Sequence, residues 1–165
     1  MNVKLVPFTK KHLKDSRLWM NDRELCRLFN RIYRFLTVTS QGQWYAKLLR
    51  DKTQLIFAIE VDGIYVGNAG LKNIDYINKK AEYYIFIGNK EYWGKGISTL
   101  ATKKFLNYTK KRLKFHKIYL HVNQFNLAAR KLYQKTGFKK EGVLRDESLR
   151  EKKYITMIRM AYFFE

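Results

Sequence analysis

The sequence predicts an α+β fold in which helices flank a mixed, largely antiparallel central sheet. Two observations support this fold class. First, the apolar runs Gln54 to Val61 and Ile64 to Leu71 are joined by Asp62-Gly63, a dipeptide typical of two-residue β-hairpin turns. Second, strand-like runs elsewhere in the chain alternate with helical patterns.

The amino-terminal part of the chain predicts one strand and three helices. Thr9 is a suitable N-cap for the first helix, and His12 on that helix is expected at the surface. The third helix is expected to begin with a capping box and to carry Trp44, Tyr45, Leu48 and Leu49. The predicted segments are a strand at Val3 to Pro7, helices at Lys10 to about Trp19 and at Arg23 to Asn30, and the capping box Ser40-Gln41-Gly42-Gln43.

The central strand, Ala81 to Gly88, follows a looser turn at Tyr76 to Lys80. Its side chains alternate, so two sets of residues lie on opposite faces. One face carries Glu82, Tyr84 and Phe86, and the other carries Tyr83, Ile85 and Ile87.

The carboxyl-terminal part predicts two helices and three strands. Gly137 stands where a C′ residue ends a helix, and Phe138 can make the accompanying hydrophobic contact. The predicted elements are a helix to about Arg112 with Leu100, Phe105, Leu106 and Tyr108 on its apolar side, a strand at Lys117 to Val122 with Ile118, Leu120 and Val122 on one face, a helix from Asn126, and strands at about Phe138 to Arg145 and Lys153 to Phe164.

Length and composition indicate a single globular domain, residues 1–165, in the cytoplasm. No segment approaches the roughly 20 apolar residues of a membrane span, and the amino end lacks a signal peptide's apolar core. Cys26, the only cysteine, is expected to be a small buried or half-buried apolar residue. Because His116 and His121 lack metal-pair spacing, both are expected to be structural, and no metal is expected.

The formal charge of +20, from 34 basic and 14 acidic residues, attracts phosphates and repels polyamines. RNA or another polyanion is the partner that charge alone suggests. A lysine-rich surface produced by coding bias is the alternative, because the basic residues are scattered along the chain.

A glycine loop, Trp93-Gly94-Lys95-Gly96-Ile97-Ser98, lies between the central strand and the following helix. Strand, loop and helix in this order leave unpaired N–H groups at a helix N-terminus, and the glycines let an anion approach the chain. The loop is therefore a candidate phosphate site. It matches neither the P-loop pattern nor the dinucleotide fingerprint.

A second motif, Asn126-Leu127-Ala128-Ala129-Arg130-Lys131-Leu132-Tyr133-Gln134-Lys135-Thr136-Gly137-Phe138, follows about thirty residues later. Together with the glycine loop it resembles the GNAT superfamily of acetyl-CoA-dependent N-acetyltransferases, with the closest likeness to ribosomal-protein alanine and spermidine acetyltransferases. The resemblance covers nearly the whole chain and is most specific from Ala81 to Arg145.

The resemblance implies a coenzyme site for acetyl-CoA. Its pyrophosphate would lie on the backbone of Trp93, Gly94, Lys95, Gly96, Ile97 and Ser98, and its pantetheine arm along Phe86 and Ile87, whose N–H groups would bind the thioester oxygen. Family members usually carry Gln or Arg in place of Trp93 and Gly or Ala in place of Ser98. Lys95 adds a charge-assisted contact or is simply solvated.

The resemblance also assigns Asn126 to the coenzyme and places Tyr133 near its sulfur. Seven residues separate the two, so both emerge on one helix face about 10 Å apart. With a phenol pKa near 10, Tyr133 can protonate a departing thiolate. The alternatives are that Asn126 is only an N-cap and Tyr133 only a core residue.

Glu82 is the candidate general base, because burial beside the thioester can raise a carboxyl pKa toward neutrality and a water can relay the proton. A surface or salt-bridged glutamate is the alternative. Related enzymes often have Asp where this chain has Thr156.

The acceptor is expected to be an anionic or neutral amine, such as a nucleotide-linked amino sugar or a protein amine, rather than a polyamine. From Leu25 to Arg50 there is no Asp or Glu, whereas five cations fall in that segment: Arg27, Arg31, Arg34, Lys47 and Arg50. A non-catalytic acyl-CoA-binding module and a basic RNA-binding protein remain the alternatives. RNA is a permitted but not required partner, and the chain is expected to be a monomer or homodimer.

Overall fold

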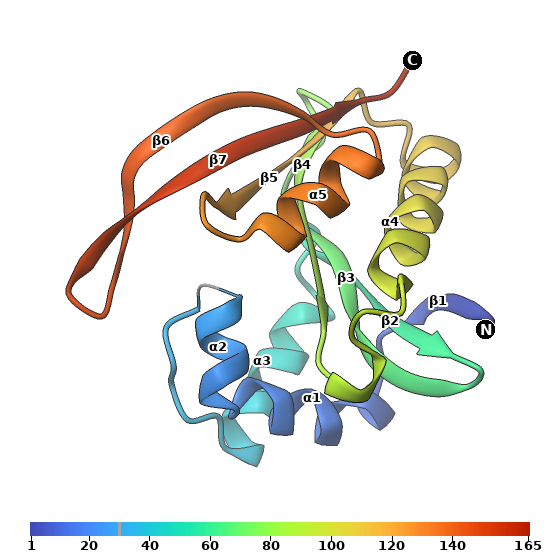
Figure 1. Cartoon of the computed structure of the whole chain (residues 1–165). Helices are drawn as coiled ribbons and strands as arrows, with labels where there is room; N and C mark the ends of the chain where they lie inside the picture. The colour runs from blue at the N-terminus through green and yellow to red at the C-terminus, as the bar shows by residue number, and fades with distance from the viewer. Residues whose placement is uncertain (30) are drawn as a thin grey trace.

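The computed structural model describes residues 1–29 and 31–165 and contains one seven-stranded sheet (Figure 1). The strand order is β1-β2-β3-β4-β5-β7-β6, and β4–β5 is the parallel pair. The strands are β1 (Val3–Pro7), β2 (Leu55–Val61), β3 (Ile64–Asp75), β4 (Lys80–Ile87), β5 (Lys117–Asn123), β6 (Lys139–Arg150) and β7 (Lys153–Phe163). The remaining neighbours pair antiparallel, which confirms the predicted mixed sheet.

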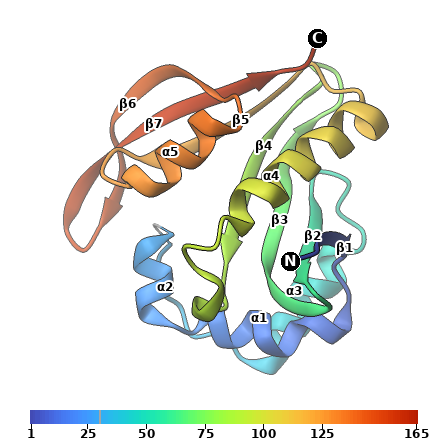
Figure 2. The same ribbon diagram turned by 45° about the vertical axis from the view of Figure 1, so that its right-hand side comes forward.

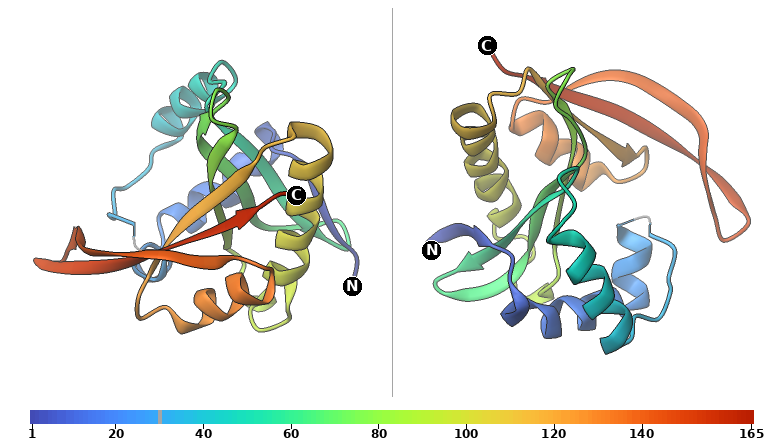
Figure 3. Two further views of the ribbon diagram at one scale, coloured as in Figure 1. Left: turned by 90° about the horizontal axis from the view of Figure 1, so that it is seen from above. Right: turned by 180° about the vertical axis from the view of Figure 1, so that it is seen from behind.

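Helices cover both faces of the sheet. α4 and α5 lie side by side on one face (Figure 2), whereas α1, α2 and α3 gather near the carboxyl end of β4 (Figure 3). The helices are α1 (Leu13–Met20), α2 (Arg23–Leu28), α3 (Val38–Leu48), α4 (Ile97–Tyr108) and α5 (Leu127–Lys135). Single turns at Lys10–His12 and Lys90–Tyr92 are 3-10 helical, and a π-helical turn, Thr109–Leu113, extends α4.

The predicted alternation of β4 is confirmed. Tyr83, Ile85 and Ile87 are buried in the main core. The Tyr83 hydroxyl lies 3.0 Å from the hydroxyl of Thr102 on α4, and its ring packs 5.0 Å from Phe105. The other face of β4, with Glu82 and Phe86, is therefore turned away from α4.

Two turns have the predicted chemistry. Asp62 and Gly63 both adopt positive φ, 50° and 85°, between β2 and β3. Gly137, with φ of 96°, follows α5, and the Phe138 N–H donates to the Tyr133 carbonyl at 2.9 Å. This six-residue closure is the helix ending expected from a C′ glycine.

Three expectations for the amino-terminal helices are corrected. His12 is 1% exposed rather than at the surface, because its ring packs against Phe8 and Tyr65. α3 begins with a capping box formed by Thr37 and Ser40, so Ser40 is its third residue instead of its cap. α2 ends at Leu28, and the predicted end at Asn30 lies outside the described residues.

The apolar side of α4 also differs from the prediction. Phe105 and Leu106 are buried as expected, but Leu100 is 41% exposed. Ile97 and Ala101 occupy the buried stripe instead. Ala101 is small enough to lie between α4 and the sheet. A prediction that selects only large apolar residues for the buried side of a helix misses it.

Candidate active site

A fork opens in the sheet where β4 and β5 separate (Figure 1). The parallel pairing of these strands ends at Glu82 and Tyr119. Beyond this point, the side of β4 that faced β5 carries main-chain groups that no described strand pairs. A ligand with amide groups can bind such an edge as an added strand would.

The hydrogen bonds at the two ends of β4 identify which amides face the fork. The Gly88 N–H donates to the Val66 carbonyl on β3, whereas the Lys79 carbonyl accepts from the N–H of His116, on the β5 side. Main-chain groups of successive strand residues point to opposite sides. The amides of Ile85 and Ile87 therefore face the fork.

This alternation corrects the expectation for Phe86. Its amide points toward β3, with which Phe86 pairs at Asn68, and cannot reach a ligand in the fork. Its side chain lies instead on the face opposite α4. The sequence analysis did not predict a role for the Ile85 amide. The alternation along the strand could have indicated it, because the amides of Phe86 and Ile87 must point to opposite sides, whereas those of Ile85 and Ile87 point to the same side.

The glycine loop adopts the conformation that only glycine reaches without strain. Gly94 and Gly96 have φ of 73° and 75°, and a Cβ added to either would meet nothing within 4 Å. Gly96 is the N-cap of α4. Within the described chain, no amide from Gly94 to Ser98 donates to a main-chain carbonyl outside its helix. The loop therefore leaves N–H groups without a main-chain partner, as an anion site requires.

Trp93 ties the loop to the end of β4. Its indole Nε1–H donates to the Ile87 carbonyl at 2.9 Å, so the ring spans from the loop to the fork. Ile97 is 1% exposed and anchors the start of α4 in the core, and Ser98 is half-buried. Lys95 is exposed, and its ammonium lies 5.2 Å from the centroid of the Tyr92 ring.

α5 holds the two residues predicted on it in different environments. The Asn126 side chain caps the helix, because its Oδ1 accepts from the Ala129 N–H at 3.0 Å; its Nδ2 group remains a donor for a ligand. Tyr133 is 8% exposed and packs edge-on against Phe138. Burial raises the pKa of the Tyr133 phenol, which keeps it protonated at neutral pH.

Glu82 is 9% exposed, and its carboxylate accepts from three side chains. Oε1 lies 3.1 Å from Lys72 Nζ and 3.2 Å from His121 Nδ1, and Oε2 accepts from Asn73 Nδ2 at 2.9 Å. Burial raises the pKa of this carboxyl, but the hydrogen bond from His121 and the Lys72 ammonium outweigh burial and hold the pKa below its ordinary value. The expectation that burial would bring this pKa toward neutrality is therefore wrong.

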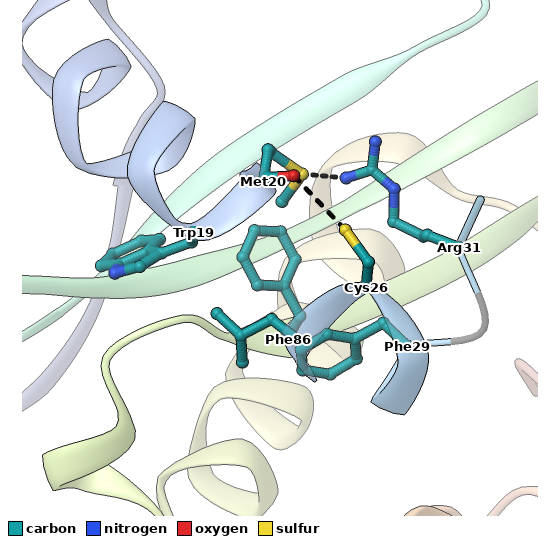
Figure 4. A pocket seen from close by; sticks show the side chains of 7 residues that line it. Trp19, Met20, Cys26, Phe29, Arg31 and Phe86 are labelled. Carbon is teal, nitrogen blue, oxygen red and sulfur yellow. Dashed lines mark hydrogen bonds between the residues drawn. The ribbon is translucent and has the colours of Figure 1, made fainter. Parts of the chain in front are cut away.

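A small pocket lies beside the end of β4, between α1, α2 and the Phe86 side chain (Figure 4). Its lining is aromatic and aliphatic apart from the thiol of Cys26 and the guanidinium of Arg31. The described residues that line it are Trp19, Met20, Leu25, Cys26, Phe29, Arg31 and Phe86. Cys26 is buried there as expected, and its Sγ lies 3.3 Å from the Met20 carbonyl.

Trp19 closes this pocket against the strand. A Cβ added to Gly88 would meet the Trp19 ring at 2.0 Å, so glycine is required for the indole to lie on the backbone. Nothing in the linear sequence brought Trp19 and Gly88 together. The close approach depends on the packing of α1 against the end of β4.

The five cations between residues 25 and 50 are all exposed, but among them only Arg31 lines the pocket. Arg27 lies 3.6 Å from Glu151, at the tip of the β6–β7 hairpin. The carboxylates that precede this segment, Asp22 and Glu24, both pair with Lys90. The pocket wall thus contributes no described carboxylate.

Among the residues that the structure describes, no group of three or more His, Cys, Asp or Glu side chains could hold a metal ion. Within the same residues, no helix is long and apolar enough to cross a membrane.

Comparison with known proteins identifies the family. The model described as "Acetyltransferase (GNAT) domain" matches residues 2–139. Spermidine N(1)-acetyltransferase of Escherichia coli strain K12 is 32% identical over 163 residues, covering 98% of this chain and 86% of that protein. A Bacillus subtilis protein, YdaF, provisionally named a ribosomal N-acetyltransferase, is 32% identical over 114 residues, 69% of this chain and 60% of its own.

The fold is likewise that of a solved enzyme. The crystal structure of spermidine N-acetyltransferase from Vibrio cholerae in complex with CoA and spermine superposes with a TM-score of 0.92 at 28% identity, covering 98% of this chain and 95% of that one. These findings confirm the predicted resemblance, including its branch.

Proposed function

The chain belongs to the GNAT acetyltransferase family and is an acetyl-CoA-dependent N-acetyltransferase; from this premise we propose that it moves the acetyl group to a primary amine by direct attack of the amine on the thioester. The observation that carries this assignment is the fork between β4 and β5, which opens beside a glycine loop with free amides. One unbranched ligand can extend from the glycine loop into the fork. We also propose that residues 1–165 act as one domain, because the central sheet includes both β1 and β7.

The coenzyme binds through main-chain groups in this proposal. The amides from Gly94 to Ser98 hold the pyrophosphate, with the α4 dipole favouring its charge. The Ile85 and Ile87 amides, which face the fork, hold the pantetheine arm and the thioester oxygen. Asn126 donates its remaining Nδ2 protons to the arm.

Tyr133 acts as general acid toward the departing thiolate. Its raised pKa keeps the proton on the phenol until a thiolate forms. The sequence proposed Glu82 as the base. Its carboxylate accepts hydrogen bonds from Lys72, Asn73 and His121 and stays ionised, so its charge stabilises a nearby cation. An ammonium of lysine-like pKa is neutral at pH 7 in only about one molecule per thousand, so a proton acceptor is still required.

The acceptor is an anionic or neutral amine, a nucleotide-linked amino sugar or a protein amine. The lining of the small pocket supports this proposal, because the Arg31 guanidinium there disfavours a second positive charge beside it and so favours the reactive neutral form of an amine. A polyamine has further positive charges, which need carboxylates that the described pocket residues do not supply.

A polyamine acceptor is the second candidate, because the E. coli and V. cholerae relatives are named for spermidine. The two candidates differ in the charge they require of the acceptor wall. An assay that varies the charge of the amine substrate can therefore distinguish the two candidates.

The deciding experiment is an acceptor screen with thiol release as readout, across amino sugars, nucleotide-linked amino sugars, amino acids, peptide N-termini and polyamines. Turnover of an anionic or neutral amine, with polyamines at background, is expected. Preferred turnover of spermidine would overturn the acceptor assignment while leaving the enzyme class intact.

The family match favours neither of the two other classes that the sequence left open, and each would behave differently in the same preparation. A non-catalytic acyl-CoA-binding module would be stabilised by acetyl-CoA yet release no thiol with any amine. A basic RNA-binding protein would bind RNA with steep salt dependence and show no thermal shift with acetyl-CoA.

A further inference from the structure

The environment of Glu82 leaves it little capacity to accept a proton. Both of its oxygens are already hydrogen-bonded, by Lys72, His121 and Asn73. A carboxylate held in this way is an anchor for its neighbours rather than a base. One of those neighbours, His121, is itself a proton acceptor.

The contact with Glu82 determines which His121 nitrogen carries the proton. An ionised carboxylate only accepts hydrogen bonds, so the 3.2 Å contact between Oε1 and Nδ1 requires a proton on Nδ1. The neutral imidazole then has its lone pair on Nε2. The His121 side chain is 24% exposed, so water can reach the ring.

His121 lies inside the fork. It is two residues beyond Tyr119, the last β5 residue that pairs with β4. Its contact with Glu82 places the imidazole on the face of β4 that also carries Phe86 and the apolar pocket. Glu82 and Ile85 are three residues apart, about 10 Å along a strand, a span that an imidazole and one or two waters can cover.

We propose that His121 is the catalytic base that takes the proton from the acceptor ammonium, directly or through water, and that Glu82 is the positioning residue that holds its ring and tautomer. This proposal rests on the proposed function. The ammonium N–H bond breaks and the proton goes to Nε2. The neutral amine then forms the C–N bond, the C–S bond breaks, and the thiolate takes a proton from Tyr133, which regains one from the attacking nitrogen.

Several charged groups surround this pair and enter its pH dependence. The Lys72 ammonium on β3 lies 3.1 Å from the Glu82 carboxylate on β4, which lies 3.2 Å from the imidazole. The Arg159 guanidinium on β7, paired with Glu141, lies over the Tyr119 ring next to His121. These are the charged neighbours that a pH profile of the pair has to include.

The test compares His121→Gln and Glu82→Gln with wild type across pH 6.5–10, with the best amine from the screen. His116→Gln is the matched control, because His116 precedes the same strand and packs on Phe163. His121→Gln should lower kcat/KM about 100-fold near pH 7, and the deficit should shrink at about pH 10 as the amine itself deprotonates. Acetyl-CoA affinity should be unchanged.

A deficit that is constant across pH, or none at all, would overturn the proposal. Failure of the proposed function looks different, because the wild-type protein would then release no thiol. If His121→Gln does not fold, nitrogen NMR of wild-type imidazoles still decides: the Nδ1–H tautomer is expected for His121, and the Nε2–H tautomer would refute the assignment.

Discussion

Replacement of Gly96 by tryptophan tests the glycine loop as the pyrophosphate site. Gly96 has φ of 75°, and a Cβ there would meet nothing within 4 Å, so the substitution strains the backbone while its Cβ clashes with no neighbour. A side chain in this left-handed region costs about 1–2 kcal/mol of folding free energy. In a chain of this length that corresponds to a fall in Tm of roughly 2–8 °C.

The effect on coenzyme binding should be much larger than the effect on stability. The indole would stand in front of the amides that we assign to the pyrophosphate. Loss of two hydrogen bonds to a charged group, at about 1.5–3 kcal/mol each, weakens binding by roughly 10²- to 10⁴-fold. Isothermal titration calorimetry with acetyl-CoA measures the affinity, and urea unfolding measures the stability.

Gly63→Trp is the matched control. Gly63 has a similar φ, 85°, and equally open space, but it lies in the β2–β3 hairpin. The two variants should lose similar stability, and only Gly96→Trp should lose coenzyme affinity. Equal acetyl-CoA affinity in Gly96→Trp and Gly63→Trp would show that the loop does not hold the pyrophosphate.

Three further predictions concern other residues. Tyr133→Phe should lower kcat about 100-fold while the acetyl-CoA Kd stays nearly constant; unchanged kcat would leave Tyr133 as a core residue only. Gly88→Ala should push the Trp19 ring from the strand and raise the acceptor KM without changing acetyl-CoA affinity, because the added Cβ would meet that ring at 2.0 Å; an unaltered KM would separate the pocket from the acceptor. Burial, and to a lesser extent the charge of Lys11, lowers the pKa of His12 below its usual 6.5. As pH falls, the unfolded chain therefore binds a proton at His12 before the folded chain does. The free energy of unfolding should thus be full above pH 6.5 and should decrease as the pH falls below 6.5. Urea unfolding of wild type and His12→Phe at pH 8 and 5.5 checks this, and equal pH dependence of the two proteins would contradict it.

Much of the site was predictable because its parts are local. The glycine loop needs positive φ angles, which Gly94 and Gly96 indicate in the sequence. The ends of α5 are likewise indicated by its N-cap, Asn126, and its C′ glycine, Gly137. The roles of single residues were less predictable. The family resemblance assigned Phe86 to the coenzyme site, but alternation along β4 turns its amide to β3 and its side chain into the pocket.

The amino-acid sequence by itself determined the order of elements, the hairpin turn, the free amides before α4 and the family. These features depend on φ preferences and side-chain periodicity within a few residues, so they can be read along the chain. Only the tertiary structure decided that Glu82 contacts His121, that Trp93 reaches the Ile87 carbonyl and that His12 is buried. The His121–Glu82 and His12–Tyr65 contacts join segments distant in sequence, so they arise only when the register and packing of the sheet bring those segments together. The Trp93–Ile87 bond spans six residues but depends on how the loop folds back on the end of β4.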